Sequence, residues 1–548
     1  MPLAQSAAFD SFEEQRERQC LAGTQQKLLT AIQRWINDDD GTTVLWLSGM
    51  AGTGKSTLSR TTAQALNGGK RIVDEPTTSN ESFLGASFFF NQRDATRNNA
   101  RSLISTVARS LARTVPELKL HIADAIAENR DIASRGLQSQ WTDLITGPLS
   151  KLNSTLVSRI RLFIVMDALD ECEDHWDVAA LLRQFASLQE FDHLRVRVMI
   201  TSRPEANIRL AFQGLPGTLY RCESVRKVQH HDSKDDIMAF LEHELPQIRT
   251  KYRHRDDWPG SETIARLHQK ADGLFVYAST ACRFLDDPWS DSRLEAIFED
   301  DVDGEAPQQS LDAIYARILT YSLRSRPQRE RQVILDMCRR ILGSIVSLFV
   351  PASITTLAQL TSTSTLEAER VLSPLHSIVE MPSDHEGPVG IVHLSFRDFL
   401  LNQERCERSP EFWVDAPRAH QDLLARCLDI MEENLHQDMC DLRMPGSHVE
   451  DLSQDVIRGY IPLHLQYACR FWIDHLAHCE TTRLSEVGLG DDGRIHRFLQ
   501  KNLLFWLETL SLIGDLTASV LPIQRLEKLV SVTISSFNVA QGFIPNNL

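Results

Sequence analysis

The chain has 548 residues, of which 42% are apolar and 24% charged, and its formal net charge is −16. This length exceeds one hydrophobic core and suits three or four domains of about 100–200 residues each. The acidic excess argues against a protein that coats nucleic acid, because phosphate contacts need clustered Lys and Arg. We therefore expect no nucleic-acid partner.

The cysteines and the apolar runs of the sequence indicate the cellular compartment in which we expect the protein. The ten cysteines are scattered and form no C-x-x-C pair, so neither a zinc site nor a disulfide framework is indicated. The N-terminal stretch lacks the basic and apolar regions of a secretory signal. No apolar run approaches the roughly 20 residues that span a bilayer. We expect a cytoplasmic protein without a membrane span, with free thiols in a reducing compartment.

Short apolar runs alternate with helical stretches in the first part of the chain. Nearly all-apolar strands separated by helices predict a parallel sheet that is covered by helices on both faces. We expect this α/β core over residues 23–230, after a polar lead-in over residues 1–22. The predicted strands are 44–47, 83–90, 162–166 and 196–200, and the predicted helices are 55–66 and 100–112.

Helical periodicity dominates the rest of the sequence. Asp232 and Ser233, followed by acidic residues, predict the start of a helix. Helical spacing then continues to about residue 340. Further along, we predict a short helix near 365–375, a strand near 389–393 and large amphipathic helices between 412 and 528.

The segment from Gly49 to Ser56 fits the phosphate-loop pattern G-x-x-x-x-G-K-[ST] in full. Its glycines let the backbone wrap around an anion, Lys55 would reach the β- and γ-phosphates, and the Ser56 hydroxyl would ligate Mg²⁺. A predicted strand precedes the loop and a predicted helix follows it, as a phosphate site requires, and the alternative is a glycine-rich turn that matches by chance. The predicted nucleotide-binding residues here are Gly49, Met50, Ala51, Gly52, Thr53, Gly54, Lys55, Ser56 and Thr57.

Acidic residues follow the predicted strand at 162–166. At this position Asp167 would hold Mg²⁺ beside the phosphate loop, together with Ser56. Asp170 and Glu171 are the predicted catalytic residues, because a second carboxylate behind the metal-binding Asp can orient or deprotonate an attacking water. The alternative is a buried strand whose acidic end is merely solvated.

Polar residues also end the predicted strand at 196–200. Ligands of parallel sheets bind at this edge, so Thr201 or Ser202 could sense the γ-phosphate. Arg203 could stabilise charge on the phosphates and is a predicted nucleotide-binding residue. A surface loop closed by Pro204 is the competing interpretation.

Together these motifs resemble those of the fungal NACHT proteins, a part of the STAND class of signal-transducing NTPases that includes animal and plant innate-immunity receptors. The resemblance covers nearly the whole chain from about residue 8. Besides the phosphate loop, it rests on the segments CLAGT (20–24), WLS (46–48), GASFFF (85–90), DALDEC (167–172), ITSRPE (200–205), ADGLFVYA (271–278), HLSFRDFL (393–400), FWVD (412–415) and LQYACR (465–470).

The resemblance implies an architecture and two further contacts. A helical domain over 231–325, a winged-helix domain over 326–405 and a second helical domain over 406–548 would follow the α/β core. His393 lies where relatives place a winged-helix His that contacts the ADP β-phosphate. Phe275 replaces the Pro of the Gly-x-Pro loop that relatives place near the nucleotide.

The function implied is that of an ADP/ATP-dependent signalling switch with slow ATP hydrolysis. ADP would hold a closed monomer, and exchange for ATP would open it and permit self-oligomerisation, in fungal self/non-self recognition or cell-death signalling with an unknown protein partner. Two alternatives stay open: a helical interaction scaffold that binds nucleotide without hydrolysing it, and a small-molecule phosphotransferase. Relatives often carry C-terminal WD or ankyrin repeats, and we recognise none in these 548 residues.

Overall fold

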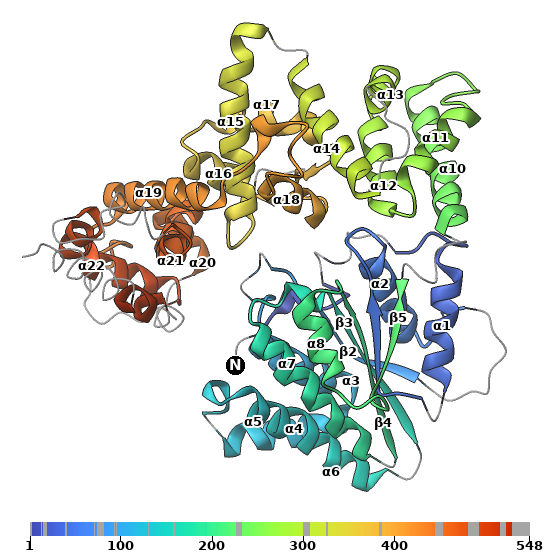
Figure 1. Ribbon diagram of the computed structural model, residues 1–548. Coiled ribbons are helices and arrows are strands. Elements are labelled where there is room, and N and C mark those ends of the chain that lie inside the picture. Colours follow the sequence, from blue (N-terminus) through green and yellow to red (C-terminus); the bar gives the residue numbers. More distant parts are fainter. Residues whose placement is uncertain are drawn as a thin grey trace, which may run out of the picture. The chain divides into compact units, whose positions relative to one another are not determined.

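The chain forms two compact units, Met1–Ile314 and Tyr315–Leu548 (Figure 1). The computed structural model describes the following residues: 3–11, 14, 19–38, 41–70, 72–73, 82–92, 94, 96–129, 131–156, 159–191, 193–225, 233–299, 307–324, 327–382, 386–443, 453–480, 493–515 and 522–528.

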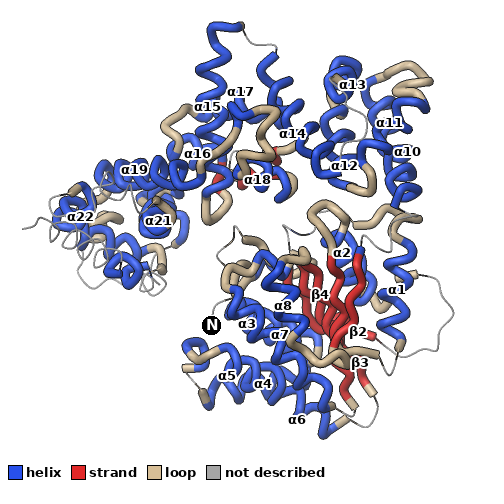
Figure 2. The backbone as a smooth tube through the Cα atoms, viewed as in Figure 1, coloured by secondary structure: helices blue, strands red, loops and turns tan. Residues whose placement is uncertain are grey.

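A five-stranded parallel sheet lies at the centre of the first unit, in the order β2-β3-β4-β1-β5 (Figures 1 and 2). The four strands predicted from apolar runs are confirmed. The fifth was missed because an edge strand with partly exposed residues, YRCES, has no apolar run. The strands are β1 (Val44–Ser48), β2 (Ser82–Phe89), β3 (Ile160–Asp167), β4 (Leu194–Ser202) and β5 (Tyr220–Ser224).

Helices cover both faces of this sheet, as predicted (Figure 2). Successive strand residues point to opposite faces, so Val44 and Trp46 enter one core while Leu45 and Leu47 enter another. The second core is covered by α1 (Gln26–Asn37) and α2 (Lys55–Asn67). The first is covered by α3 (Ala100–Thr114), α4 (Pro116–Glu128), α5 (Leu137–Trp141), α6 (Gly147–Thr155), α7 (His175–Gln184) and α8 (Ala206–Gln213).

The beginning of the chain packs onto the sheet domain, whereas a polar lead-in was expected. Ala4 and Ala7, beside a 3-10 turn at Gln5–Ala7, are fully buried in the first core. The Ala4 N–H donates to Thr106 Oγ1 over 3.0 Å, and the Phe9 N–H donates to Ser87 Oγ over 3.0 Å. We call the described residues between positions 3 and 14 the N-terminal strap.

Among the described residues, α10 to α13 follow the sheet domain in the first unit (Figure 1), and α14 begins in the first unit and ends in the second. The helix predicted to start near Ser233 is confirmed, although Asp232 lies outside the described residues. The helices are α10 (Ser233–Tyr252), α11 (Ser261–Ala271), α12 (Phe275–Leu285), α13 (Ser290–Phe298) and α14 (Pro307–Arg324).

The second unit is mainly helical and contains a small antiparallel sheet of order β6-β8-β7. No helix in the described part of the chain is both long and apolar enough to cross a membrane. The elements of the second unit are α15 (Gln328–Ser347), β6 (Ala352–Ser353), α16 (Ile354–Leu360), α17 (Thr365–Leu372), β7 (Val379–Glu380), β8 (Pro388–Ile391), α18 (Leu394–Leu401), α19 (Ala416–Asn434), α20 (Gln454–Tyr460), α21 (Leu463–Ala477) and α22 (Arg494–Leu512).

Candidate nucleotide site

The glycine-rich loop joins the end of β1 to the start of α2 and needs its glycines for two reasons. Gly52 and Gly54 have φ angles of +77° and +87°, in the left-handed region that favours glycine. A Cβ at Gly52 would also lie 2.2 Å from Val276 Cγ1, and one at Gly49 would lie 2.7 Å from Thr53 Oγ1. The local backbone therefore disfavours a side chain at these positions.

The Lys55 side chain hydrogen-bonds to the backbone of the phosphate loop. Its ammonium group donates to the carbonyl oxygens of Gly49, over 2.8 Å, and Met50, over 2.9 Å. An ammonium group has three N–H donors, so these two bonds leave one for a phosphate oxygen. Burial lowers the pKa of Lys55, whereas the carboxylates of Asp170 and Asp167 act in the opposite direction.

Asp167 ends β3 as a buried carboxylate held by two hydroxyls. Its Oδ1 accepts from Ser59 Oγ over 2.7 Å and from Thr201 Oγ1 over 2.6 Å. Within the described residues both donors approach the same oxygen, so Oδ2 can face a metal-bound water. Sequence reasoning missed Ser59, which lies one helical turn after Ser56 on the same side of α2.

Thr201 and Ser202, the two candidates for γ-phosphate sensing, have buried side chains whose hydroxyls are engaged by neighbouring residues. Thr201 Oγ1 accepts from the Ala168 N–H over 3.0 Å and donates to Asp167. Ser202 Oγ accepts from the indole N–H of Trp46 over 2.8 Å. These two residues orient the strand ends instead.

The two predicted catalytic carboxylates have different partners. Asp170 accepts from the Arg203 N–H over 3.0 Å and lies 3.3 Å from Arg203 Nε, so it holds the arginine at the end of β4. Glu171 Oε2 accepts from the Gln92 N–H over 3.1 Å. Burial and, to a smaller extent, the nearby Asp170 charge together raise the pKa of Glu171 to about 8.

The remaining predicted residues of the loop lie at its surface. Met50 is 48% exposed, and Ala51, Ser56 and Thr57 are partly exposed. No group of three or more metal-ligating side chains occurs among the described residues. A Mg²⁺ ion bound through Ser56 and Asp167 would therefore complete its shell with phosphate oxygens and water, the arrangement this ion favours at nucleotide sites.

Two helices of the following domain contact this region. The Val276 N–H, in the first turn of α12, donates to the Gly52 carbonyl over 3.3 Å. Asp236 of α10 accepts from the Gln25 N–H over 2.9 Å, just before α1. Phe275, which replaces the Pro of the family pattern, begins α12 next to Val276. Sequence reasoning had identified neither Val276 nor Asp236.

His393 lies in the second unit, where it caps α18. Its Nδ1 accepts from the Ser395 N–H over 3.1 Å and lies 2.7 Å from Ser395 Oγ. The same hydroxyl lies 2.7 Å from the phenol oxygen of Tyr315. A backbone N–H only donates, so Nδ1 carries no proton, and the proton of the neutral ring lies on Nε2.

Comparisons with known proteins confirm the expected resemblance. Residues 23–203 match the family model described as nephrocystin 3, N-terminal. The chain is 26% identical over 527 residues to the vegetative incompatibility protein HET-E-1 of Podospora anserina, a match that covers 92% of this chain and 36% of the relative. This chain thus spans about a third of that relative's length. By sequence the chain is similar to this fungal protein over most of its own length.

A looser likeness occurs among solved structures. The Aeropyrum pernix ORC1 protein in complex with DNA aligns at 15% identity, with a TM-score of 0.29 and coverage of 71% of this chain and 94% of that one. At this score the likeness supports no conclusion about the arrangement of domains or about ligands. The fold class rests on the parallel sheet and its covering helices.

Proposed function

We propose that this chain is an ATP/ADP-dependent switch of the NACHT type, with slow hydrolysis that limits the lifetime of the ATP state. The observation that carries the proposal is the closed phosphate loop with Lys55 at its centre and Asp167 at the neighbouring strand end. The buried carboxylate, the lysine and the glycine-rich backbone would together hold a nucleoside triphosphate with its metal ion.

Each residue of the site has a role under this proposal. The backbone amides of Gly49–Ser56 and the Lys55 ammonium bind the phosphates, while Ser56 and Asp167 hold Mg²⁺. When bound, this ion neutralises charge that develops on the phosphates. Ser59 and Thr201 fix the orientation of Asp167. Arg203, held by Asp170, supplies a further positive charge at the strand ends.

We assign the hydrolytic base to Glu171 rather than Asp170. Asp170 is engaged by Arg203 through two of its atoms, whereas Glu171 accepts a single backbone N–H. A pKa of about 8 leaves most Glu171 protonated at pH 7, so it is a poor base there. Slow hydrolysis follows, which suits a switch that requires lifetime more than turnover.

The helical domain would sense the state of the loop through Val276. A ligand shifts a two-state equilibrium only as far as it prefers one state, and the bond from Val276 to Gly52 gives α12 direct contact with the phosphate-binding backbone. By resemblance, His393 would contact the β-phosphate of ADP. By resemblance, residues 326–405 would form the winged helix, and ATP would permit self-oligomerisation.

The biological setting is proposed by analogy alone. The curated relative is named for vegetative incompatibility, which favours fungal self/non-self recognition or cell-death signalling in the cytoplasm. The trigger and the protein partner would lie outside the site described above.

The nucleotide that the chain retains tests the proposal. We would denature the purified protein and separate the released material by chromatography, with Lys55→Ala as the control. Near-stoichiometric ADP that is lost in the variant would support a switch resting in its closed state. A protein that retains nothing and binds neither added ATP nor added ADP would refute it and favour the scaffold. Acceleration of γ-phosphate loss by a small acceptor would instead favour the phosphotransferase.

A further inference from the structure

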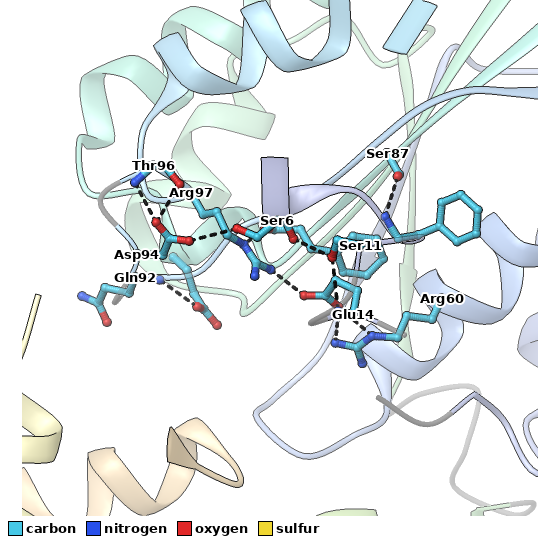
Figure 3. A network of polar contacts seen from close by, with 12 residues as sticks. Ser6, Ser11, Glu14, Arg60, Ser87, Gln92, Asp94, Thr96 and Arg97 are labelled. Carbon is cyan, nitrogen blue, oxygen red and sulfur yellow. Dashed lines mark hydrogen bonds and ion pairs between the residues drawn. The ribbon is translucent and has the colours of Figure 1, made fainter. Parts of the chain in front are cut away.

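A buried carboxylate of the N-terminal strap lies between two arginines of the sheet domain. Glu14 Oε1 lies 2.5 Å from Arg97 Nη2, and Oε2 lies 2.8 Å from Arg60 Nη2 (Figure 3). The Glu14 and Arg97 side chains are 7% and 6% exposed, and that of Arg60 is 15% exposed. Ion pairs this buried hold their geometry, because removal of one partner leaves an uncompensated charge away from water.

The two arginines belong to elements that flank the candidate site. Arg60 follows Ser59 in α2, and Ser59 donates to the metal-binding candidate Asp167. Arg97 follows β2, at the edge of the sheet where ligands of parallel sheets bind. We use the name 91–97 loop for the described residues of this segment, which are Asn91, Gln92, Asp94, Thr96 and Arg97. Glu14 thus joins the phosphate-loop helix to the 91–97 loop.

The same loop also holds the proposed base. The Gln92 N–H donates to Glu171, and Arg97 Nε donates to the Phe89 carbonyl over 2.9 Å. The strap contacts this loop at a second point, where Ser6 Oγ donates to Asp94 over 3.2 Å (Figure 3). The path from the strap to Glu171 is therefore short and consists of hydrogen bonds and ion pairs.

We propose that Glu14 is a positioning residue for ATP hydrolysis, and that the strap holds the 91–97 loop so that Gln92 keeps the Glu171 carboxylate in place. An event that lifts the strap would slow hydrolysis and lengthen the ATP state without removing a phosphate contact. This inference rests on the proposed function, since it assigns a regulator to the same site.

A carboxylate-to-amide exchange in the full chain tests this role. Glu14→Gln keeps the size of the side chain but removes the charge that neutralises the two arginines. We expect kcat for ATP hydrolysis to fall about tenfold, a part of what a general base supplies, with KM for ATP within about twofold of the unaltered protein. Hydrogen exchange at the Gln92 amide should become faster.

The pH profile separates positioning from general damage. Loss of the Gln92 hydrogen bond, which favours the ionised form, should move the midpoint of the rate profile to higher pH. Asp170, Asp167 and Arg203 also act on Glu171 and are unchanged in this variant. The matched control is Asp10→Asn, which makes the same exchange in the strap, in an exposed pair with Arg113 at 3.1 Å. Asp10→Asn should leave kcat, the pH profile of the rate and hydrogen exchange at the Gln92 amide unchanged.

Several results would overturn the proposal: an unchanged kcat in Glu14→Gln, an equal loss in Asp10→Asn, or a profile that does not move. Should Glu14→Gln fail to fold, Ser6→Ala is the alternative variant, because it removes only the second contact of the strap. Ser6→Ala should lower kcat about twofold. A kcat equal to that of the unaltered protein would refute the positioning role of the strap. If the unaltered chain binds no ATP, the proposed function fails first. The Gln92 amide then still tests the strap, because unchanged exchange in Glu14→Gln rejects the coupling.

Discussion

Substitution of Gly52 by alanine tests the geometry of the phosphate loop and of its contact with α12. Two independent effects oppose the added methyl group. The φ angle of +77° costs a residue with a Cβ about 1–2 kcal/mol. The Cβ would also lie 2.2 Å from Val276 Cγ1, which forces a shift of loop or helix.

The size of the effect follows from these terms. Overpacking of this kind costs about 1–3 kcal/mol, so the two terms together give about 2–5 kcal/mol. If the loop yields rather than the fold, this energy appears as lost nucleotide affinity, a factor of about 30 to 4,000 at 1.4 kcal/mol per decade. Val276→Ala combined with Gly52→Ala should recover only a part of the overpacking cost, because the Cβ of residue 276, which alanine keeps, still lies 2.7 Å from the added Cβ and the strained φ remains.

Calorimetric titration with ADP measures the affinity, and thermal unfolding reports on the fold. Gly69→Ala is the matched control: this glycine follows α2 with a φ of +59°, and nothing lies within 4 Å of its added Cβ. It should lower stability by about 1 kcal/mol through the same strain and leave ADP binding unchanged. ADP binding by Gly52→Ala within threefold of the unaltered chain would refute the close approach of Val276. Full recovery of ADP affinity in the double variant would refute the cost assigned to the positive φ at position 52.

Three further predictions concern charge. Glu171 acts only when ionised, so hydrolysis should rise by up to about tenfold per pH unit towards pH 8, and Glu171→Gln should flatten this rise. Asp167→Asn should retain nucleotide binding without Mg²⁺ but lose the gain in affinity that Mg²⁺ gives; an unchanged gain would exclude Asp167 as a metal ligand. Burial lowers the pKa of His420 to about 3 and that of His475 well below 6.5, so below pH 6.5 the unfolded chain binds protons that the folded chain excludes. As the pH is lowered below 6.5, the free energy of unfolding should decrease by up to about 1.4 kcal/mol per pH unit for each of the two histidines. Guanidinium titration followed by circular dichroism measures this dependence. An unchanged dependence on pH in His420→Gln would contradict the prediction.

The sequence revealed the parts of the site that local pattern specifies. The phosphate loop is a contiguous motif, and Asp167 follows a strand that is buried along nearly its whole length. The bond from Thr201 to Asp167 was not predicted, because the surroundings of Thr201 depend on strand order. Since β4 lies beside β3 with Ile200 opposite Met166, the next residues, Thr201 and Asp167, are neighbours at the sheet edge. That order is not readable from the chain itself.

The N-terminal strap is a second feature that the sequence does not predict. Its composition is polar, which predicts a linker, yet Ala4 and Ala7 are small enough to enter the core, and the N–H groups of Ala4 and Phe9 hydrogen-bond to the sheet domain. Glu14 is a charged residue that local pattern places in solvent, and only the folded chain brings Arg60 and Arg97 to it. Burial of such a charge depends on partners distant in sequence, so periodicity cannot predict it.

Two contacts reach the candidate site from outside the phosphate-binding motif, and we expect them to act on different steps. Val276 touches Gly52, whose backbone would meet the phosphates, so a change there alters which nucleotide is preferred. Glu14 acts on Gln92 and Glu171, so a change there alters how long ATP survives. A switch needs both quantities set separately, because affinity fixes the populations while hydrolysis fixes the lifetime. Val276→Ala should therefore change the ratio of ADP to ATP affinity with little effect on kcat, and Glu14→Gln the reverse. Variants that change both quantities together would show that the two contacts form one coupled element.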